Sequence, residues 1–367
     1  MRFSNSNILK IKPYKVSSPK AWIHVGDDNV LKLDWNESTI RPSPKVYERI
    51  KQIFSERKWN WYPDIENTVL KKSIAKYCNV MEKNIQYFAS SDSLHEHIVR
   101  AFVSTNDKIL TVSPTYDNFR AVAEANNAEV IFFSLDKPNF KLNFKAFEKQ
   151  LSELNPKIVY VVNPNNPTGT LHEKSKFEKI IKKFNNILFI FDEAYYEFSE
   201  KTFSDYIIKN DNVIISRTFS KAFGLASFRI GYMISNEDII ETINKIRNPK
   251  NISLFAQEAA NAALQDIKYV KEYVNSVNRN KKSFFNYLNN LTWVKPIYGS
   301  GNFIFMKVDT EYKNNFIKFL ENKKIYIRDY SHINSTKDYV RITIGTATQM
   351  KRVELVIDQF QKYMQKL

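Results

Sequence analysis

Residues 158–169 read IVYVVNPNNPTG, five apolar residues followed directly by a loop of Asn and Pro. β-Branched and aromatic residues favour strands, and a strand that is apolar on both faces is typical of a parallel sheet covered by helices. The two X-Pro steps predict an extended loop, which Gly169 ends. An ordinary Asn/Pro turn is the simpler alternative, but ligands of parallel sheets bind beyond the carboxyl ends of strands. The stretch therefore predicts a buried strand that leads into a ligand-binding loop.

Similar apolar runs alternate with helical patterns on both sides of this strand, from about residue 85 to residue 235. They are Lys108–Val112, Val130–Phe133, Ile187–Phe191, Val213–Ser216 and Ile230–Ile234. Strands that alternate with helices predict an α/β domain with a mostly parallel sheet.

The two ends of the chain have different patterns. From about residue 266, a long polar helix over Ile267–Leu288 precedes mixed strands and helices, which predicts a smaller α+β unit. The first 45 residues are irregular apart from a short VLKLD run, and they predict an arm that packs on another part of the molecule. The expected division is an arm at 1–45, a large domain at 46–265 and a small C-terminal domain at 266–367.

The composition excludes several classes of protein. The chain has 367 residues, of which 43% are hydrophobic and 14% aromatic, so it is neither disordered nor collagen-like. The only cysteine, Cys78, excludes an intrachain disulfide and a multi-cysteine metal site. No signal-peptide pattern is visible and no run approaches the about 18 apolar residues that span a bilayer. We therefore expect a cytoplasmic protein without a membrane partner.

The charge of +16 comes from lysines scattered over polar helices. Clustered arginines and a nucleic-acid-binding module are missing, so we expect no nucleic-acid partner. A basic surface still favours anionic substrates by electrostatic steering. His95 and His97 are expected on opposite sides of a helix without a third ligand nearby, and we expect no metal site.

Glycine marks the segments of interest, because a chain with only seven glycines should keep them where a side chain is not tolerated. Six of the seven fall in four short segments, NPNNPTG, SKAFGLASFRIGY, YGSGNF and RITIGT. In the second segment Lys221 stands beside hydroxyls of Thr218 and Ser220, with Arg229 eight residues on. Together they predict an anion site beside an amine. A desolvated amine near a cation has a lowered pKa and is a usable nucleophile or base.

Two further motifs follow apolar runs. Asp192 ends a buried strand, where an acid without a partner costs free energy. A cofactor with a protonated ring nitrogen, such as pyridoxal phosphate (PLP), would pair with it. The alternative is that Asp192 caps the next helix. Ser90-Ser91-Asp92-Ser93 opens a helix, and Ser93 with Glu96 fits a capping box. The free N–H groups of such a helix end bind phosphate, although alone the motif is only a cap.

The ordered set NPNNPTG, FDEAY, RTFSKAFGLASFRIGY and YVRITIGT resembles fold-type I PLP enzymes of aminotransferase class I/II. Among these, histidinol-phosphate aminotransferases are the most similar, and the resemblance extends over nearly the whole chain. It implies an aspartate aminotransferase-like fold, PLP as cofactor and a homodimer with shared active sites.

The resemblance implies roles for the matching positions. Lys221 would join the cofactor aldehyde and later move the substrate proton, and Asp192 would pair with the ring nitrogen. Tyr195 and Asn166 would hydrogen-bond the ring oxygen, and Tyr116 would stack on the ring. The residues implied to bind the cofactor phosphate are Ser91, Asp92, Ser93, Ser220, Arg229 and, reaching the neighbouring subunit's cofactor, Tyr62. Those implied to bind or cover the substrate are Asn36, Asn302, Arg328 and Arg341.

Departures from the family pattern concern the phosphate loop and the substrate. Ser90 and Ser93 occupy positions where the family has Gly and Glu, so the loop geometry is expected to shift. Ile40 replaces an aromatic residue of the substrate pocket, and Arg41 and Lys250 add cations. These changes weaken the case for an imidazole substrate and favour a small anionic one, such as a short phosphorylated ketone or amine.

Three functions follow from these motifs. The first is an aminotransferase that moves an amino group between an amino acid such as glutamate and a small phosphorylated keto compound. The second is a PLP-dependent decarboxylase of a phosphorylated amino acid, of the phosphoserine or phosphothreonine type; RTFSKAF and DEAYYEF look more like the transaminase branch. The third is a non-catalytic binding or regulatory protein on the same fold, against which the intact set around Lys221 and Asp192 argues.

Overall fold

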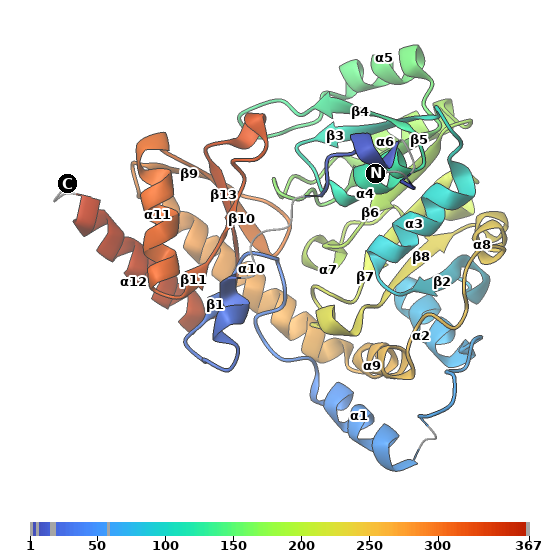
Figure 1. The fold of residues 1–367 in the computed structure, drawn as a ribbon, viewed down its shortest axis with the longest axis horizontal. Coiled ribbons are helices and arrows are strands. Elements are labelled where there is room, and N and C mark those ends of the chain that lie inside the picture. The colour runs from blue at the N-terminus through green and yellow to red at the C-terminus, as the bar shows by residue number, and fades with distance from the viewer. Residues whose placement is uncertain (1–2, 5–6, 15–19, 57–58, 365–367) are drawn as a thin grey trace.

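The computed structural model describes residues 3–4, 7–14, 20–56 and 59–364. The strands of its large sheet are β2 (Ile85–Phe88), β3 (Lys108–Ser113), β4 (Glu129–Ser134), β5 (Ile158–Val162), β6 (Leu188–Asp192), β7 (Val213–Thr218) and β8 (Gly231–Ser235). Within the described ranges these seven strands form one sheet in the order β2-β8-β7-β6-β5-β3-β4. The predicted run over residues 158–162 is confirmed as β5, and the mostly parallel α/β sheet is confirmed with it (Figure 1).

One strand departs from the parallel pattern. β8 is antiparallel to both β2 and β7, whereas the other neighbours are parallel. The run Ile230–Ile234, grouped with the parallel strands in the sequence, therefore points the other way. The physical reason is its connection, because only residues 219–230 join β7 to β8, with a single 3-10 turn at Ala226–Phe228. A parallel pair needs a longer crossover that usually contains a helix.

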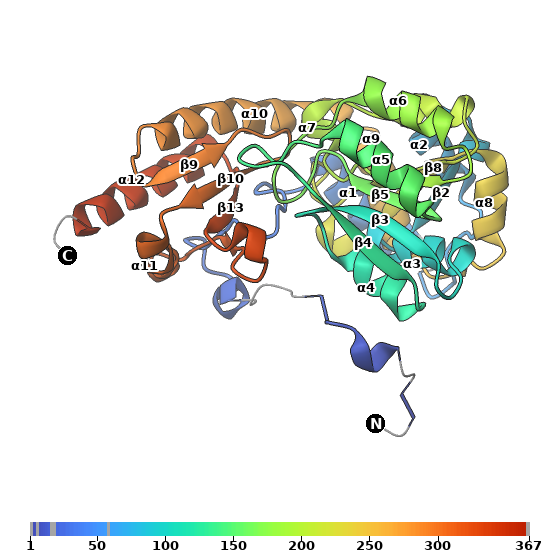
Figure 2. The ribbon, with the colours of Figure 1, turned by 90° about the horizontal axis from the view of Figure 1, so that it is seen from above.

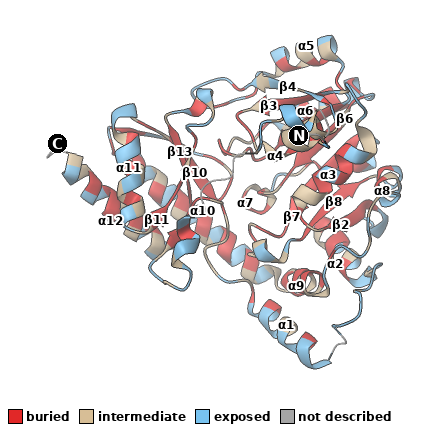
Figure 3. Cartoon of the chain, in the orientation of Figure 1, coloured by how far each residue is buried: buried red, intermediate tan, exposed pale blue. Residues whose placement is uncertain are grey.

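Helices cover both faces of the sheet, as Figures 1 and 2 show. Their bounds are α1 (Pro44–Glu56), α2 (Thr68–Cys78), α3 (Ser91–Phe102), α4 (Asn118–Ala125), α5 (Phe144–Leu154), α6 (Lys174–Lys183), α7 (Tyr196–Ser199), α8 (Glu237–Asn244) and α9 (Leu254–Leu264). One hydrophobic cluster joins α3, α4 and α8 to strand residues such as Ile158 and Ile190. The alternate strand residues, such as Val159 and Phe189, pack against α2, α5 and α6 on the other face. The burial pattern of Figure 3 agrees with this layering.

The C-terminal part carries a second, antiparallel sheet. Its strands are β9 (Val294–Ile297), β10 (Phe303–Val308), β12 (Arg328–Asp329) and β13 (Tyr339–Thr343), in the order β12-β13-β10-β9. Its helices are α10 (Ile267–Asn289), α11 (Thr310–Asn322) and α12 (Ala347–Met364). This is the predicted small α+β unit. Short 3-10 turns stand at Ile8–Lys10, Lys20–His24, Glu82–Asn84, Ser204–Ile208, Ala226–Phe228 and Asn334–Thr336.

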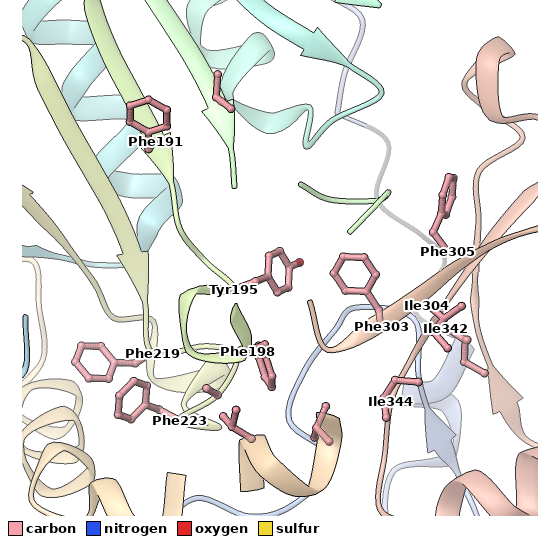
Figure 4. Packing of buried hydrophobic residues seen from close by; sticks show 14 of the residues in the cluster. Phe191, Tyr195, Phe198, Phe219, Phe223, Phe303, Ile304, Phe305, Ile342 and Ile344 are labelled. Atoms are coloured by element: carbon pink, nitrogen blue, oxygen red, sulfur yellow. The ribbon is translucent and has the colours of Figure 1, made fainter. Parts of the chain in front are cut away.

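Aromatic side chains join the two sheets. In Figure 4 the Tyr195 ring of the large sheet's loop faces Phe303 of β10, and the ring centroids lie 5.2 Å apart in an edge-to-face arrangement. Both residues belong to one hydrophobic cluster that also contains Phe219 and Ile342. The apolar contact stabilises the position of the small sheet relative to the strand ends that carry the polar motifs.

The described parts of the N-terminal segment contact two regions of the molecule, the surroundings of α4 and the C-terminal part. Asn7 donates a hydrogen bond from Nδ2 to the carbonyl of Ala125 (2.9 Å), and Arg120 Nη2 donates to the carbonyl of Lys12 (3.0 Å). Further along, β1 (Leu31–Lys32) pairs in parallel with β11 (Ile325–Tyr326). In the described part of the chain, no helix has the length and apolar character needed to cross a membrane.

Candidate active site

A cavity of about 680 Å³ lies between the large sheet and the small sheet. The last residues of β5, β6 and β7, which are Val162, Asp192 and Thr218, line one side of it. Arg328 of β12 and Arg341 of β13, paired directly across the small sheet, line the other side. The cavity thus lies beyond the carboxyl ends of parallel strands, where ligands of such sheets bind.

Lys221 projects into this cavity from the turn that follows β7. Its Nζ donates a hydrogen bond to the backbone carbonyl of Trp35 in the N-terminal segment, at 2.8 Å. Burial lowers the pKa of the amine to about 8, the carboxylate of Glu37 opposes this shift, and the Arg341 cation adds to it. An amine with such a pKa is partly neutral near physiological pH, so it can act as a nucleophile or a base.

Asp192 ends β6 with only 3% of its surface exposed. Its Oδ2 accepts a hydrogen bond from the Tyr160 hydroxyl (2.8 Å), and its Oδ1 accepts one from the Ala194 N–H (3.1 Å). Burial raises the pKa of this carboxyl group, while His95 and the Tyr160 hydrogen bond oppose the shift. No Lys or Arg of the described ranges forms an ion pair with this buried acid, so it suits a ligand that brings its own positive charge.

The N-terminus of α3 forms the polar end of the cavity. Ser90 is the N-cap, and its side chain accepts a hydrogen bond from the N–H of Ser93 (3.1 Å). The predicted capping box of Ser93 with Glu96 is therefore wrong, because the helix begins at Ser91 and Ser93 already lies inside its first turn. A Cβ placed on Gly231 would lie 2.7 Å from the backbone nitrogen of Ser91, so this helix end approaches β8 as closely as a glycine allows.

Anion-binding groups surround this helix end. Ser91, Asp92, Ser220 and Arg229 line the cavity. The Arg229 guanidinium lies 3.5 Å from a carboxylate oxygen of Asp92, whose other oxygen accepts a hydrogen bond from Tyr116 (2.8 Å). Free N–H groups at a helix N-terminus, serine hydroxyls and an arginine together suit a phosphate.

The side chains near Arg341 form one hydrogen-bonded group. Arg341 Nη1 donates to Asn166 Oδ1 and to the Tyr330 hydroxyl (2.9 Å), and Nη2 donates to the carbonyl of Asp34. Tyr195 lies on the same cavity wall and accepts a hydrogen bond from Asn36 Nδ2 (2.9 Å). Both side chains line the cavity, and each is held by a different partner: Asn166 by Arg341, and Tyr195 by Asn36.

Several residues singled out in the sequence do not line this cavity. Asn36 and Asn302 are fully buried behind Tyr195, and Asn302 donates from Nδ2 to the carbonyl of Asn36 (3.1 Å). Ser93 faces the N-cap, and the exposed Tyr62 lines a separate groove beside α1 and α9.

The three residues that suggested a small anionic substrate also lie elsewhere. Ile40 packs on the hydrophobic core, Arg41 is exposed, and the Lys250 amine lies 4.9 Å from the centre of the Tyr62 ring. Within one chain, none of these three residues lines the cavity. The backbone carbonyl of Arg41 accepts a hydrogen bond from the Tyr269 hydroxyl of α10 (2.9 Å). Because Lys250 lies beside Tyr62, a role for these residues in a site shared between subunits stays a prediction. The arginines on the cavity wall are Arg229, Arg328 and Arg341.

Sequence reasoning missed other cavity residues. Tyr14 meets the Tyr116 ring edge-on at 5.6 Å, and no motif marks it. Tyr330 stands two residues after Arg328, so the alternation of side chains along an extended segment could have placed both on one face. His95 was missed as well; it does not line the cavity but lies buried behind it, four residues after Ser91 on the same face of α3.

The residues present fit PLP. The buried acid of Asp192 on the cavity wall suits its ring nitrogen, and the helix end with Ser220 and Arg229 suits its phosphate. The Lys221 amine lies on the same cavity wall. Tyr116 adds an aromatic ring to that wall.

Comparisons with known proteins agree with this fit. The family model of aminotransferase class I and II matches residues 28–358. A dihydroxyacetone phosphate transaminase of Campylobacter jejuni is 44% identical over 361 residues, which cover 98% of this chain and 97% of that protein. A histidinol-phosphate aminotransferase of Clostridium novyi is 33% identical over 324 residues, covering 88% of this chain and 90% of that protein.

Solved structures share the fold. The crystal structure of histidinol-phosphate aminotransferase from Sinorhizobium meliloti in complex with pyridoxal-5'-phosphate superposes with a TM-score of 0.87 at 23% identity, covering 99% of this chain and 98% of that one. The aspartate aminotransferase of Thermus thermophilus with maleate gives a TM-score of 0.81 at 15% identity, covering 98% and 100%. At these identities the likeness shows the fold.

Proposed function

Because the chain belongs to the aminotransferase class I and II family, we propose that this PLP-dependent transaminase moves an amino group between an amino acid such as glutamate and a small phosphorylated keto compound. The observation that carries the proposal is the pair Arg328 and Arg341, which face the Lys221 amine across one cavity. The relative that acts on dihydroxyacetone phosphate supports a three-carbon phosphorylated ketone as the substrate class.

Arg328 and Tyr14 would hold the substrate's phosphate. Burial raises the pKa of the Tyr14 hydroxyl, and the positive fields of Arg328 and, more weakly, Arg341 oppose that shift, so Tyr14 lies within the influence of both guanidinium groups. A phenol that stays protonated beside two arginines donates one more hydrogen bond to an anion. Planar guanidinium groups match the geometry of phosphate oxygens.

Arg341 would hold the group nearer the reacting carbon. Two of its nitrogens are used by Asn166, Tyr330 and the Asp34 carbonyl, which keep the guanidinium rigid. Its Nε is buried and has no hydrogen-bond partner among the described residues. The positive charge of this fixed guanidinium lies on the cavity wall, where it would attract a carboxylate of the amino acid.

We propose that the cavity residues bind PLP in the roles that the family resemblance implies. Asp192 would accept the proton of the ring nitrogen, and Tyr195 with Asn166 would bind the ring oxygen. Tyr116 would stack on the ring. The phosphate would be held by Ser91, Ser220, Arg229 and the backbone N–H of Asp92, because the helix end and the positive charge of Arg229 favour an anion. Bound PLP supplies an electron sink that weakens bonds at the substrate's α-carbon.

Lys221 would carry the proton transfer. Its amine lies where a substrate held by the two arginines meets the cofactor wall, and its pKa of about 8 lets Nζ both take up and release a proton near neutral pH. Asn36 and Asn302 would act from behind, because they fix the Tyr195 hydroxyl and the arm that covers the cavity.

We also propose a homodimer in which Tyr62 reaches the neighbouring subunit's cofactor phosphate. Around Tyr62, large apolar side chains are exposed on α1, on the segment before α2 and on the first turn of α2, namely Tyr47, Phe54, Trp59, Trp61, Ile65 and Val69. Contiguous exposed apolar surface of this kind marks a protein interface, and a second copy of the chain is the usual partner. The division into an arm (1–45), a large domain (46–265) and a small domain (266–367) remains part of the proposal.

Absorbance spectra and product analysis test the function. The PLP-loaded protein mixed with glutamate should change to the pyridoxamine spectrum, and dihydroxyacetone phosphate should restore the original spectrum while it becomes the corresponding amino alcohol phosphate. Release of CO2 from phosphoserine or phosphothreonine, without a spectral change in glutamate, would instead show a decarboxylase. Turnover of histidinol phosphate as fast as that of the three-carbon compound would contradict the proposed substrate class.

A further inference from the structure

We propose that His95 is a positioning residue, which holds the Asp192 carboxylate in the orientation and charge state that bind the ring nitrogen of PLP. This inference rests on the proposed role of Asp192. It adds a residue that lies behind the cavity wall and touches neither cofactor nor substrate.

The geometry places His95 against both the acid and its neighbouring strand. His95 lies on the inner face of α3 and has no exposed surface. Its Nε2 is 3.7 Å from Asp192 Oδ2 and 3.2 Å from Ser216 Oγ. Asp192 and Ser216 are direct register partners on β6 and β7, so the imidazole edge covers the pair from one side.

The surroundings of the ring determine where its proton points. The rings of Phe119 and Tyr160 meet the imidazole edge-on at 5.6 and 5.4 Å, and they stack on each other at 4.2 Å. The Nδ1 atom has no hydrogen-bond partner in the part of the chain that the structure describes. If the proton is on Nε2, the atom without a partner is Nδ1 as an acceptor, and no buried N–H donor is left unpaired. The Nε2–H then points toward the oxygens of Ser216 and Asp192.

An imidazole at this position is unfavourable for packing alone. Its neighbours on the buried face of α3, Leu94, Ile98 and Val99, are fully buried and apolar. A leucine at 95 would continue this face without an unpaired buried nitrogen, which costs free energy. A residue that departs from the local pattern beside a functional acid is where a functional constraint is expected.

His95 acts on the charge of Asp192. Burial raises the pKa of the carboxyl group, and among the opposing groups His95 comes first, ahead of the Tyr160 hydroxyl and the Ala194 N–H. The charge of Asp92 acts in the other direction. Without His95 the carboxylate would be less stable in its ionised form, and its attraction for a protonated ring nitrogen would weaken.

The test compares His95→Leu, His95→Gln and the control His172→Leu. Gln keeps an N–H close to the position of Nε2, whereas Leu removes it. His172 is also a buried imidazole with one nitrogen that has no partner among the described residues, but no ion pair or hydrogen bond within those residues joins its ring to Asp192, whereas His95 lies 3.7 Å from that carboxylate. The measurements are the Kd of PLP for each apo protein and the pH at which the ring nitrogen of 15N-labelled bound PLP loses its proton, followed by NMR.

We expect His95→Leu to raise the Kd about tenfold, the effect of losing one hydrogen bond or close polar contact to a charged group. The ring nitrogen should lose its proton at a lower pH than in the unchanged protein. His95→Gln should restore both values, and His172→Leu should change neither. His95→Leu alone leaves the Ser216 hydroxyl without its imidazole partner. If that variant does not fold, the double variant His95→Leu/Ser216→Ala, which removes this hydroxyl as well, replaces it in the test.

An Asp192→Asn variant separates this inference from the proposed function. If Asp192→Asn lowers the pH of ring-nitrogen deprotonation and His95→Leu does not, the inference about His95 is wrong. If Asp192→Asn also leaves that pH unchanged, the proposed placement of the cofactor ring against Asp192 is wrong.

Discussion

The amine of Lys221 donates a hydrogen bond to the backbone carbonyl of Trp35, 2.8 Å away, and so joins the turn after β7 to the N-terminal arm. The arm is in turn attached to the C-terminal part, where β1 and β11 form a separate two-stranded sheet and the Thr343 N–H of β13 donates to the Leu33 carbonyl (2.9 Å). Lys32 lies 4.0 Å above the Trp35 ring and forms ion pairs with Asp34 and Glu37. Three separate parts of the chain thus meet at one amine, and the proposed chemistry depends on their relative positions.

The reactivity of this amine should depend on pH in a defined way. Burial lowers the pKa of Lys221 to about 8, and only the neutral amine attacks an aldehyde. The rate at which the apo protein captures PLP should therefore rise with pH and level off above about 8. Stopped-flow absorbance measures this rate. A midpoint near 10.5, the ordinary lysine pKa, would show that the amine is solvated instead of buried.

The two arginines of the small sheet should determine affinity for the phosphorylated ketone. Arg328→Gln should lower kcat/KM about 10- to 100-fold, because a charge-assisted hydrogen bond is lost. Most of the loss should appear in KM. Arg279→Gln, at an exposed position of α10, is the matched control and should leave steady-state kinetics unchanged. Equal kinetics for Arg328→Gln and Arg279→Gln would remove Arg328 from the substrate site.

The close approach of α3 to β8 predicts a cost for a single methyl group. In Gly231→Ala the new Cβ would lie 2.7 Å from the Ser91 nitrogen and 2.8 Å from the Arg217 carbonyl oxygen, both backbone atoms. We expect a loss of about 1–3 kcal/mol in the free energy of unfolding together with weaker PLP binding, since the helix end must move. Urea unfolding and PLP titration measure the two effects.

Gly345→Ala is the control for this prediction. There the nearest atom to the new Cβ is the far end of the Gln349 side chain, which can turn away. Its loss in stability should be smaller and its PLP affinity unchanged. Equal effects of the two substitutions would show that the α3 contact has no special role.

A buried ion pair below the active-site loop should matter for stability. Arg217 donates from Nε (3.0 Å) and Nη2 (2.8 Å) to Glu193 Oε2, and its guanidinium lies 3.6 Å from the centre of the Tyr196 ring. Arg217→Met leaves the Glu193 charge buried without its partner, which should cost about 3–5 kcal/mol in unfolding free energy.

The exposed pair of Lys83 and Glu237 gives the comparison for this ion pair. Lys83→Met should change the free energy of unfolding by less than about 1 kcal/mol, since surface ion pairs contribute little. Denaturant unfolding of both variants checks the contrast. A cost for Arg217→Met no larger than that for Lys83→Met would mean that Glu193 finds another partner.

Local patterns were sufficient for the sheet and for the polar strand ends. The apolar run at residues 158–162 is β5 as predicted, and Asp192 and Lys221 meet at one cavity because the carboxyl ends of parallel strands share one edge. The direction of β8 was missed, because residues 230–234 are as apolar as a parallel strand and only the short connection before them reverses the chain.

Contacts between distant segments could not be found in this way. Tyr14 contacts Tyr116 from a distant part of the sequence, and no periodicity in the sequence indicates such a contact. Arg41 was expected near the substrate from its position in the motif; within one chain it is exposed and does not line the cavity. His95 was identified as a helix residue without a metal partner, and its neighbour Asp192 comes from a strand 97 positions later (192 − 95).

Covalent trapping shows directly whether Lys221 is the residue that joins the cofactor. Borohydride reduction of the PLP-loaded protein, followed by proteolysis and mass spectrometry, should find the pyridoxyl mass on the peptide that contains Lys221, and Lys221→Ala should carry none. A pyridoxyl mass on another lysine of the unchanged protein, or no stable incorporation at all, would contradict the account.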